Sequence, residues 1–410
     1  MSTAHAGPLH GITVIDFTQM MAGPFATQIL ADMGANVIKV EKPITGEWER
    51  GLASMGSFIG GQSPFFLAMN RGKRSLAVDL KDERGKEIVR NLIRGADVVM
   101  SNFRPGAMER LGFGFDDVRA INPDVIYLAS SGYGNTGPWV DRPGQDLLIQ
   151  SVSGLVAQNG PSTTNPIPVA TSVMDAITAL YNVIGVLSAL MGRKNHVDVG
   201  EVHVSMLSAA LAIQCQELVA HINLQQDFAR SSSGLASPWN EAPYGIYETR
   251  DGYAAIAMAD LRVLGDLLGL AELVEIAQSK NPFARRDDAK TLIEERTRTY
   301  NRDELIDLLL TKDVWCAPVL SFTETLQQEQ VTGSGILRSL HHEHYGEFQG
   351  IGLPIAFSGF TPSYDVPPPM PGQDTLEILK MAGLSDDAID QLIRDRIISA
   401  PEKLAVHDDQ

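Results

Sequence analysis

A single carboxylate lies near the start of a long apolar stretch of the chain. The stretch PVATSVMDAITALYNVIGVLSALMGR, residues 168–193, has the composition of a buried helix, and Asp175 is its one acidic residue. An aspartate just before an apolar run commonly accepts a hydrogen bond from a free amide of the first helical turn. These residues alone therefore favour a helix cap as the role of Asp175.

Three basic residues gather before an expected strand. The segment NRGKRSLAVDLK, residues 70–81, brings Arg71, Lys73 and Arg74 together. Guanidinium and ammonium groups bind phosphate through charge-assisted hydrogen bonds, but the same residues are common in solvated loops. A phosphate contact and a solvated charged loop are both compatible with this segment.

Two further patterns resemble cofactor motifs but lack the context that those motifs require. The segment GYGNTG, residues 132–137, has the glycine spacing of a dinucleotide site, yet Pro138 and polar residues follow it instead of a helix. The segment HHEHYGEF, residues 341–348, lacks the helical spacing of a metal site and is interpreted as a solvated turn. We therefore expect no NAD, no flavin and no metal. No G-x-S-x-G elbow supports a serine hydrolase.

Composition and charge limit the class of protein. The chain has 410 residues, of which 44% are hydrophobic and 20% charged, as is typical of a globular protein of two domains or of one domain with a large insertion. Its net charge of −17 argues against nucleic acid or an anionic membrane as a partner.

We find neither the pattern of a secretory signal nor an uninterrupted apolar run of membrane-spanning length, so a cytoplasmic location is expected. Cys215 and Cys316 are expected to be small core residues.

Positive charge is concentrated near the start of the chain. Residues 1–110 carry 13 Lys and Arg against 11 Asp and Glu, although the chain as a whole is strongly acidic. If the protein binds an anion, this part of the chain is where the site is expected.

Short apolar segments alternate with helical patterns over the first 132 residues. The expected strands are residues 11–17, 36–43, 74–80, 97–103 and 124–132, and the expected helices are residues 23–35, 82–96 and 115–121. Such alternation is typical of a twisted, mostly parallel sheet with helices on both faces. Ligands of these sheets bind outside the carboxyl ends of the strands, where the segments DFTQMMAGP, KVEKP, SNFRPG and SSGYG fall.

A change of pattern near residue 225 indicates a second, smaller domain. The serine-rich stretch at residues 229–245 precedes IYETRDGYAAIAMAD, which predicts an antiparallel hairpin with Asp251 and Gly252 at its turn. We expect a large domain over residues 1–224, completed by residues 336–410, and a small domain over residues 225–335. The proline-rich segment DVPPPMPG, residues 365–372, is interpreted as a linker.

Several motifs, taken in order, resemble those of the class III CoA-transferases. This family includes the formyl-CoA, carnitine-type and bile-acid-inducible CoA-transferases and the related α-methylacyl-CoA racemases. The motifs are GITVIDFTQMMAGPFATQILADMGANVIKVEKP, NRGKRSLAVDLK, SNFRPGAMERLG, LASSGYGNTGP, the apolar stretch with Asp175, APYGIYETRDGY and VWCAPV. The resemblance implies an α/β fold with a mostly parallel, Rossmann-like sheet domain and a smaller α+β domain, in an interlocked homodimer.

The resemblance also implies a second role for Asp175. The family's nucleophile is an aspartate that opens the helix after the sheet of the first domain, and Asp175 matches it. With an ordinary pKa near 4 it would be ionised at pH 7 and would need no general base to attack a thioester carbonyl. The implied reaction moves CoA from an acyl-CoA donor to a free carboxylic acid through an aspartyl mixed anhydride and an aspartyl-CoA thioester. Cap and nucleophile are compatible roles.

Matching motifs imply the residues that bind CoA, which is a substrate here and not a resident cofactor. The expected contacts agree with the excess of positive charge near the start of the chain. They are Met21, Ala22, Lys42, Val78, Asp79, Leu80, Lys81, Asn102, Phe103, Arg104, Arg110, Gln145 and Asp146. The first two match contacts to the pantetheine end, and Lys42 matches a contact to the phosphates. The last two match positions near the thioester.

Two departures from the family pattern bear on the reaction. Met21 stands where the formyl-CoA:oxalate branch has a glutamine, and SSSGLASP stands where that branch has a run of glycines, which argues against formyl-CoA and oxalate as the substrates. Gln145 stands where the racemase branch has a histidine. A CoA-transferase is therefore favoured, with an α-methylacyl-CoA racemase and a non-catalytic acyl-CoA-binding protein as the alternatives.

Overall fold

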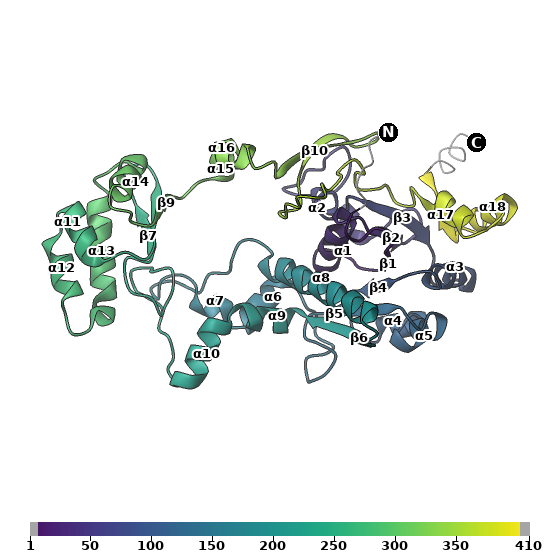
Figure 1. Ribbon diagram of the computed structural model, residues 1–410, viewed down its shortest axis with the longest axis horizontal. Helices are drawn as coiled ribbons and strands as arrows, with labels where there is room; N and C mark the ends of the chain where they lie inside the picture. The colour runs from purple at the N-terminus through teal and green to yellow at the C-terminus, as the bar shows by residue number, and fades with distance from the viewer. Residues whose placement is uncertain (1–6, 402–410) are drawn as a thin grey trace. The chain divides into compact units, whose positions relative to one another are not determined.

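The computed structural model describes residues 7–401, and this part of the chain forms two compact units (Figure 1). The first unit comprises the residues up to Ile149, Ser172–Ala209 and the residues from Gln330 onward, and the second comprises Gln150–Thr171 and Ala210–Glu329. Residues 150–171 and 210–224 therefore belong to the second unit, whereas the sequence analysis assigned them to the large domain.

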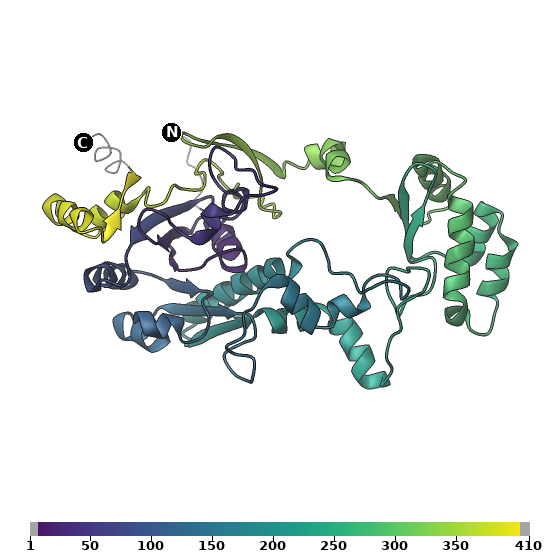
Figure 2. The ribbon, with the colours of Figure 1, turned by 180° about the vertical axis from the view of Figure 1, so that it is seen from behind.

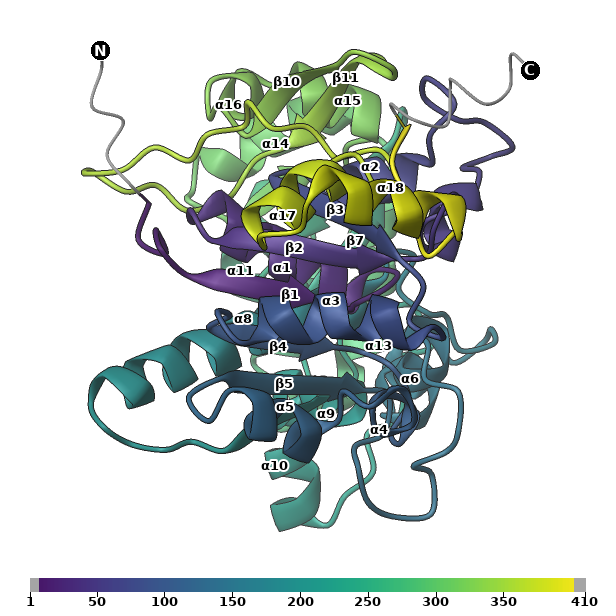
Figure 3. The same cartoon turned by 90° about the vertical axis from the view of Figure 1, so that its right-hand side faces the viewer.

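A seven-stranded sheet forms the centre of the first unit, with its strands seen one below another in Figure 3. In spatial order the strands are β12 (Ile398–Ser399), β3 (Lys73–Val78), β2 (Asn36–Glu41), β1 (Thr13–Asp16), β4 (Val98–Ser101), β5 (Ile126–Ser131) and β6 (Glu201–Ser205). All neighbours pair in parallel except β12, which runs antiparallel to β3. The predicted α/β fold with a mostly parallel sheet is confirmed.

Helices cover both faces of this sheet. The helices of the first unit are α1 (Ala22–Asp32), α2 (Pro64–Met69), α3 (Glu83–Ile93), α4 (Ala107–Leu111), α5 (Phe115–Ile121), α8 (Val173–Lys194), α17 (Thr375–Met381) and α18 (Asp386–Arg394), with a 3₁₀ helix at Trp48–Gly51. Helices α6 (Asp146–Val152), α9 (Met206–Ile213) and α16 (Glu329–Thr332) include the boundaries between the units. Helices α1 and α8 pack on one face, and α3, α5, α17 and α18 pack on the other.

Successive strand residues face opposite sides of the sheet, and both sides are apolar. Val14, Val98 and Met100 pack with α1 and α8, whereas their neighbours Ile15 and Val99 pack with the helices of the other face. Full burial of one such side chain stabilises the fold by about 1.5–3 kcal/mol. A strand buried on both faces is a continuous apolar run in the sequence, which explains why these strands were predictable.

Helix α8 is long and apolar enough to cross a membrane by length and composition, with a mean hydropathy of 1.7 over its most apolar window. This corrects the expectation that no apolar run of that length is present. In the structure, however, its face with Ala179, Val183 and Val186 is buried against the sheet and α1. We therefore interpret α8 as a core helix whose packing fixes the position of Asp175.

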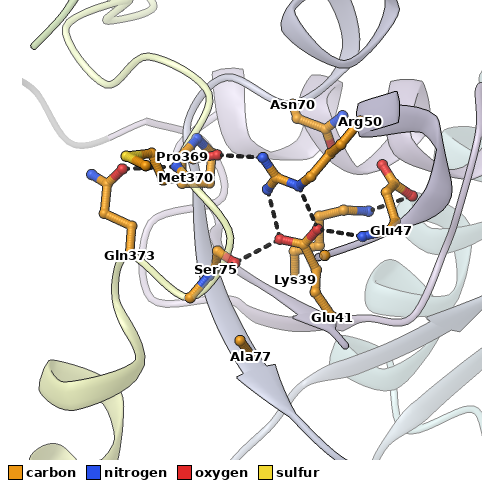
Figure 4. Close-up of polar contacts among 12 residues, drawn as sticks. Lys39, Glu41, Glu47, Arg50, Asn70, Ser75, Ala77, Pro369, Met370 and Gln373 are labelled. Atoms are coloured by element: carbon orange, nitrogen blue, oxygen red, sulfur yellow. Dashed lines mark hydrogen bonds and ion pairs between the residues drawn. The ribbon is translucent and has the colours of Figure 1, made fainter. Parts of the chain in front are cut away.

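The C-terminal segment is held at the carboxyl end of β2 through a buried ion pair (Figure 4). Arg50 donates Nε and Nη2 to the two carboxylate oxygens of Glu41, at 2.8 and 2.7 Å, and donates Nη1 to the Pro369 carbonyl at 3.0 Å. Burial raises the pKa of Glu41, but the Arg50 guanidinium outweighs burial, and the pKa falls to about 2. The segment interpreted as a linker, residues 365–372, is therefore anchored to the first unit.

Two of the three basic residues around the start of β3 are used inside the unit. Arg71 pairs with Asp32 at 2.6 Å and Lys73 pairs with Asp16 at 3.2 Å, and all four side chains are buried. Arg74 is partly exposed and pairs with a glutamate of α17 at 3.1 Å. A buried and neutralised cation is not available to a phosphate, so for Arg71 and Lys73 neither a solvated loop nor a phosphate contact describes the structure.

The histidine-rich segment belongs to a hairpin. Strands β10 (Leu337–His342) and β11 (Gly346–Ile351) pair antiparallel, and residues 343–345 form the turn between them. The expected turn is therefore present, with Glu343 and His344 exposed, but the rest of the segment belongs to the two strands. His342 is buried, its Nε2 lies 3.1 Å from the Gln373 side-chain oxygen, and its ring stacks on Tyr345. Within residues 7–401, no three or more His, Cys, Asp or Glu side chains form a group that could hold a metal ion.

A three-stranded antiparallel sheet and several helices form the second unit (Figure 2). The strands are β7 (Gly245–Glu248), β8 (Tyr253–Ile256) and β9 (Cys316–Pro318), and the helices are α7 (Leu155–Gln158), α10 (Cys215–Leu224), α11 (Leu261–Leu268), α12 (Ala271–Ala277), α13 (Arg286–Thr297), α14 (Arg302–Leu310) and α15 (Phe322–Gln327), with a 3₁₀ helix at Pro282–Arg285. Strands β7 and β8 form the hairpin predicted around Asp251 and Gly252. Cys215 is exposed and Cys316 is partly buried, so the expectation of two core cysteines is wrong for Cys215.

Candidate active site

A cavity of about 480 Å³ opens at the carboxyl edge of the central sheet. Loops that follow β1, β4 and β5 line it, together with the first turn of α8. Strand β1 lies between β2 and β4, so the strand order reverses direction beside it. Open sheets of this kind bind their ligands at such a reversal, outside the carboxyl ends of the strands.

Asp175 is the carboxylate of this cavity. It lies in the first turn of α8 and lines the cavity together with Ala22, the first residue of α1, whose backbone amide lowers the pKa of the Asp175 carboxyl. The carboxylate therefore lies near the N-termini of two helices, whose dipoles favour negative charge. The Ala22 amide of α1 is a possible donor for an oxyanion that forms at this carboxyl group.

The pKa of Asp175 differs from the ordinary value assumed from the sequence. Burial raises this pKa most, and the nearby charge of Asp146 raises it further, while the Ala22 amide opposes both. The result is a pKa of about 6 in place of a value near 4. The carboxylate is still mostly ionised at pH 7 and is a stronger base than an ordinary aspartate.

Asp146, and not Asp175, caps helix α8. The Oδ1 atom of Asp146 accepts hydrogen bonds from the Met174 amide at 2.6 Å and from the Asp175 amide at 3.2 Å. The residue before the helix, Ser172, makes no capping hydrogen bond through its side chain. The interpretation of Asp175 as a helix cap is therefore wrong, and its carboxylate is directed to the cavity instead.

The turn between β1 and α1 forms one wall of the cavity. The Gln19 amide donates to the Asn102 side-chain oxygen at 2.8 Å, and the Asn102 side-chain nitrogen donates to the Gln19 carbonyl at 2.7 Å. Met20 follows with a φ of 62°, a left-handed conformation that is uncommon for a residue with a side chain. The turn then ends at Ala22, whose backbone amide lowers the pKa of Asp175.

The structure brings some of the sequence-predicted contact residues to this cavity and leaves others outside its lining. Ala22, Asn102, Phe103, Arg104 and Gln145 line it together with the predicted nucleophile. Met21 lies between two lining residues without lining the cavity itself, and Asp146 lies beside it as the cap of α8. The remaining predicted contacts lie outside the lining and are Lys42, Val78, Asp79, Leu80, Lys81 and Arg110.

Several predicted cations are nevertheless close to the carboxyl edge of the sheet and have no acidic partner. Lys42 follows β2, Lys81 follows β3 and Arg104 follows β4. In the part of the chain that the structure describes, none of the three forms an ion pair, and all three are exposed. By contrast, Arg84 on α3 pairs with Asp395. The unpaired cations are available to a polyanionic ligand.

Several lining residues were not predicted from the sequence. Trp48 is the first residue of a 3₁₀ helix in the long connection between β2 and β3, for which the sequence analysis expected no element. Met20 lines the cavity where Met21 was expected, because the left-handed conformation at Met20 turns the chain there. Arg142 lies in the polar segment after GYGNTG, its guanidinium 4.9 Å from the centre of the Trp139 ring. Composition alone gave no signal for these three side chains.

The two roles of Asp146 lead to a testable expectation. Replacing Asp146 by alanine should destabilise the first unit by about 1 kcal/mol through loss of the α8 cap, and should lower the pKa of Asp175 by removing a like charge. Replacing Asp146 by asparagine should lower the pKa of Asp175 to a similar extent and retain most of the stability, since an amide oxygen still caps. Urea denaturation and the pH dependence of the reaction measure the two effects; an unchanged pH profile in both variants would contradict this account.

The fold and the cavity define an open α/β protein that binds its ligand at the reversal point of a parallel sheet, beside a carboxylate. The sequence model of CoA-transferase family III matches residues 9–375. The chain therefore belongs to CoA-transferase family III, and it is a CoA-transferase that uses acyl-CoA as a substrate.

Relatives and solved structures agree with this assignment. Succinyl-CoA:glutarate CoA-transferase of Mus musculus is 30% identical over 403 residues, which cover 96% of this chain and 91% of the relative. Formyl-CoA:oxalate CoA-transferase of Streptomyces avermitilis is 31% identical over 401 residues, which cover 93% of this chain and 97% of the relative. The crystal structure of a CAIB/BAIF family protein from Brucella suis has a TM-score of 0.79 and 30% identity, and the match covers 92% of this chain and all of that one.

Proposed function

We propose that Asp175 is the covalent nucleophile of a transfer reaction that moves CoA from an acyl-CoA donor to a free carboxylic acid. The observation that carries this proposal is the position of the Asp175 carboxylate in the cavity, which Ala22 at the start of α1 also lines, and where Asp175 caps no helix of its own. A carboxylate with a pKa of about 6 is ionised at neutral pH and needs no general base.

The proposed reaction consists of four displacements at carbonyl carbons. An Asp175 oxygen attacks the thioester carbonyl, the carbon–sulfur bond breaks, and a mixed anhydride and the CoA thiolate result. The thiolate attacks the aspartyl carbonyl and releases the donor acid, which leaves an aspartyl-CoA thioester. The acceptor carboxylate attacks that thioester and forms a second anhydride with release of the thiolate. The thiolate then attacks the acceptor's acyl carbon, which gives the new acyl-CoA and restores the Asp175 carboxylate.

The Ala22 amide supports this reaction because negative charge develops at the aspartyl oxygen in two of the four steps. A donor already aimed at that oxygen stabilises the tetrahedral intermediates without reorganisation, an effect of several kcal/mol in comparable oxyanion sites. The α8 amides do not add to it directly, since Asp146 already accepts two of them.

We further propose that unpaired cations at the carboxyl edge bind the phosphates of CoA. Replacing Lys42 or Arg104 by alanine should each weaken CoA binding by roughly 10-fold or more, because a hydrogen bond to a charged group contributes about 1.5–3 kcal/mol when it is well desolvated. Isothermal titration calorimetry with CoA measures the effect. Arg84→Ala is the matched control, since Arg84 is exposed but already paired. Unchanged affinity for CoA in both Lys42→Ala and Arg104→Ala would refute the proposal that these cations bind its phosphates.

The acid substrates are proposed to be larger than oxalate, with four to six carbons and one or two carboxyl groups. Sulfur-bearing and apolar side chains in the turn after β1 support this, because a glutamine stands at Met21 in the formyl-CoA:oxalate branch. A relative that acts on succinyl-CoA and glutarate supports the same range. The experiment is a panel of acetyl-, succinyl- and butyryl-CoA with many free acids, read by mass spectrometry. Rapid formyl transfer to oxalate would overturn this choice.

Two alternatives to CoA transfer predict different outcomes when acyl exchange and deuterium exchange at the α-carbon are measured together. An α-methylacyl-CoA racemase with one base on each face of the substrate needs two titratable groups, and Gln145, which lines the cavity, cannot titrate. Deuterium exchange at the α-carbon of a 2-methylacyl-CoA without acyl exchange would favour the racemase. A non-catalytic acyl-CoA-binding protein would show neither reaction.

The assembly is proposed to be the interlocked homodimer that the family resemblance implies, and the location is proposed to be cytoplasmic. The chain has a mass of 44.5 kDa, so light scattering at micromolar concentration should give about twice this mass for the dimer. A monodisperse particle with the mass of one chain would contradict the dimer.

A further inference from the structure

Two lysines are buried in adjacent strands of the central sheet. Lys39 of β2 and Lys73 of β3 have exposed fractions of 0% and 1%. A buried ammonium group is costly unless its N–H groups are used and its charge is compensated. Lys39 pairs with Glu47 at 3.2 Å, and Lys73 pairs with Asp16 at 3.2 Å and donates to the Asn70 side-chain oxygen at 2.7 Å.

The remaining hydrogen bond of Lys39 goes to the connection between β1 and α1, and that of Lys73 goes to the first turn of α1. Lys39 Nζ donates to the Thr18 carbonyl at 2.8 Å, and Lys73 Nζ donates to the Pro24 carbonyl at 3.0 Å. Asp16 also fixes the connection, because its Oδ1 accepts the Thr18 amide at 2.8 Å and the Thr18 hydroxyl at 2.5 Å. The chain is therefore held on both sides of Ala22, which lines the cavity together with Asp175 and whose amide lowers the pKa of that carboxyl.

The segment between these two anchors is tight. Met20 has a φ of 62°, and a Cβ added to Gly23 would overlap the Thr18 side chain. A left-handed non-glycine residue costs of order 1–3 kcal/mol and persists only where its surroundings hold it. The anchored carbonyls of Thr18 and Pro24 supply that restraint.

We propose that Lys39 and Lys73 are positioning residues of the transfer reaction, because their ammonium groups hold both ends of the turn that aims the Ala22 amide at Asp175. Their role is to keep the donor in place while the aspartyl group passes from carboxylate to anhydride and thioester. This inference rests on the proposed function, in which Asp175 is the nucleophile. It adds two buried residues that touch neither CoA nor the acid.

The pH dependence of the reaction distinguishes positioning from a merely structural role. Burial, the charge of Asp146 and the Ala22 amide set the pKa of Asp175, and neither lysine acts on it directly. Of these three influences only the Ala22 amide lowers this pKa, so moving that amide away removes the lowering effect. A movement of the turn therefore raises the pH at which the rate falls off on the acid side.

The test uses the full-length enzyme with the charge-balanced pair Asp16→Asn and Lys73→Met, which leaves no unpaired buried charge between these two positions. We expect kcat to fall 10- to 100-fold, the KM for acyl-CoA to stay within threefold, and the acid limb of the pH profile to move up by at least half a pH unit. Thr18→Val is a second variant of nearly unchanged shape that removes only the hydroxyl bond to Asp16, and it should shift the acid limb in the same direction by less.

The matched control is Lys290→Met in the second unit. Lys290 is equally buried and pairs with Glu294 at 2.9 Å, so its loss should lower stability without moving the acid limb. A folded double variant or a folded Thr18→Val variant with the wild-type kcat and the wild-type acid limb would overturn the inference. If Asp175→Asn also retains transfer, the proposed function has failed; if Asp175→Asn is inactive, only the positioning role has failed.

Discussion

Replacing Asp175 by asparagine should abolish CoA transfer, lowering kcat by a factor on the order of 10⁴ or more, while the fold and CoA binding are retained. The amide has almost the shape of the carboxylate but is a poor nucleophile. The substitution removes no helix cap, because Asp146 supplies it. The asparagine side chain still presents an oxygen toward the Ala22 amide, so the turn after β1 should keep its conformation.

The assay is acyl-CoA exchange with freshly purified enzyme, in which mass spectrometry has excluded deamidation back to aspartate. Asp141→Asn is the matched control, since Asp141 is exposed close to the cavity and has no role in the proposed reaction. The control should retain the wild-type rate. Retained transfer in Asp175→Asn would contradict the covalent mechanism.

The pKa of Asp175 sets the expected pH dependence of the wild-type enzyme. Only the ionised carboxylate attacks, and its pKa is about 6. The rate constant kcat/KM should therefore be nearly constant above pH 7 and should fall about tenfold for each pH unit well below 6. An acid limb near pH 4 would mean that the carboxylate is not buried beside Asp146 in the working enzyme.

Replacing Arg50 by methionine should have the largest effect on stability, lowering the free energy of unfolding by about 3–5 kcal/mol. The variant leaves the Glu41 carboxylate buried without its cationic partner and leaves the Pro369 carbonyl without its donor (Figure 4). Adding Glu41→Gln to the variant should recover part of the loss, because the unpaired charge is then removed. Urea denaturation followed by circular dichroism measures both.

The pH dependence of this effect has a definite sign. The pKa of Glu41 is about 2 in the folded protein and near 4.5 in the unfolded chain, so its ion pair stabilises the fold above about pH 4.5. This contribution is lost as the pH falls toward 2, and the difference between wild type and Arg50→Met should narrow over that range. Arg84→Met, which breaks exposed pairs with Asp82 and Asp395, should lower the stability far less than Arg50→Met. An equally small loss in Arg50→Met would contradict the role of the buried pair.

The central sheet could be predicted from the sequence because apolar side chains cover both of its faces. The predicted strands over residues 11–132 are rich in apolar and β-branched residues, and each is followed by a turn or helix signal. The position of Asp175 at the start of α8 was predictable for the same reason. Its pKa was not, because the value depends on burial and on Asp146, which lies 29 residues earlier in the chain.

The polar interior could not be predicted, because local sequence does not reveal a partner that is distant along the chain. Lys73 stands in a basic segment that has the composition of a surface loop, yet it pairs with Asp16, 57 residues away. Asp146 caps α8 from a position distant along the chain, so the sequence favoured the nearer Asp175 for this role. Met20 lines the cavity instead of Met21 because Met20 adopts the left-handed backbone conformation. The sequence gives no sign of this conformation, because the position holds a methionine and not a glycine or an asparagine.

Transfer of an oxygen isotope tests the central claim most directly. During turnover with an acceptor acid labelled with ¹⁸O in its carboxylate, the acid's oxygen attacks the aspartyl-CoA thioester and stays on Asp175 when the second anhydride collapses. Mass spectrometry of the peptide that contains Asp175 should therefore show incorporation of ¹⁸O that increases with turnover and requires both acyl-CoA and acid. Full transfer activity without label in that peptide would contradict the aspartyl mechanism.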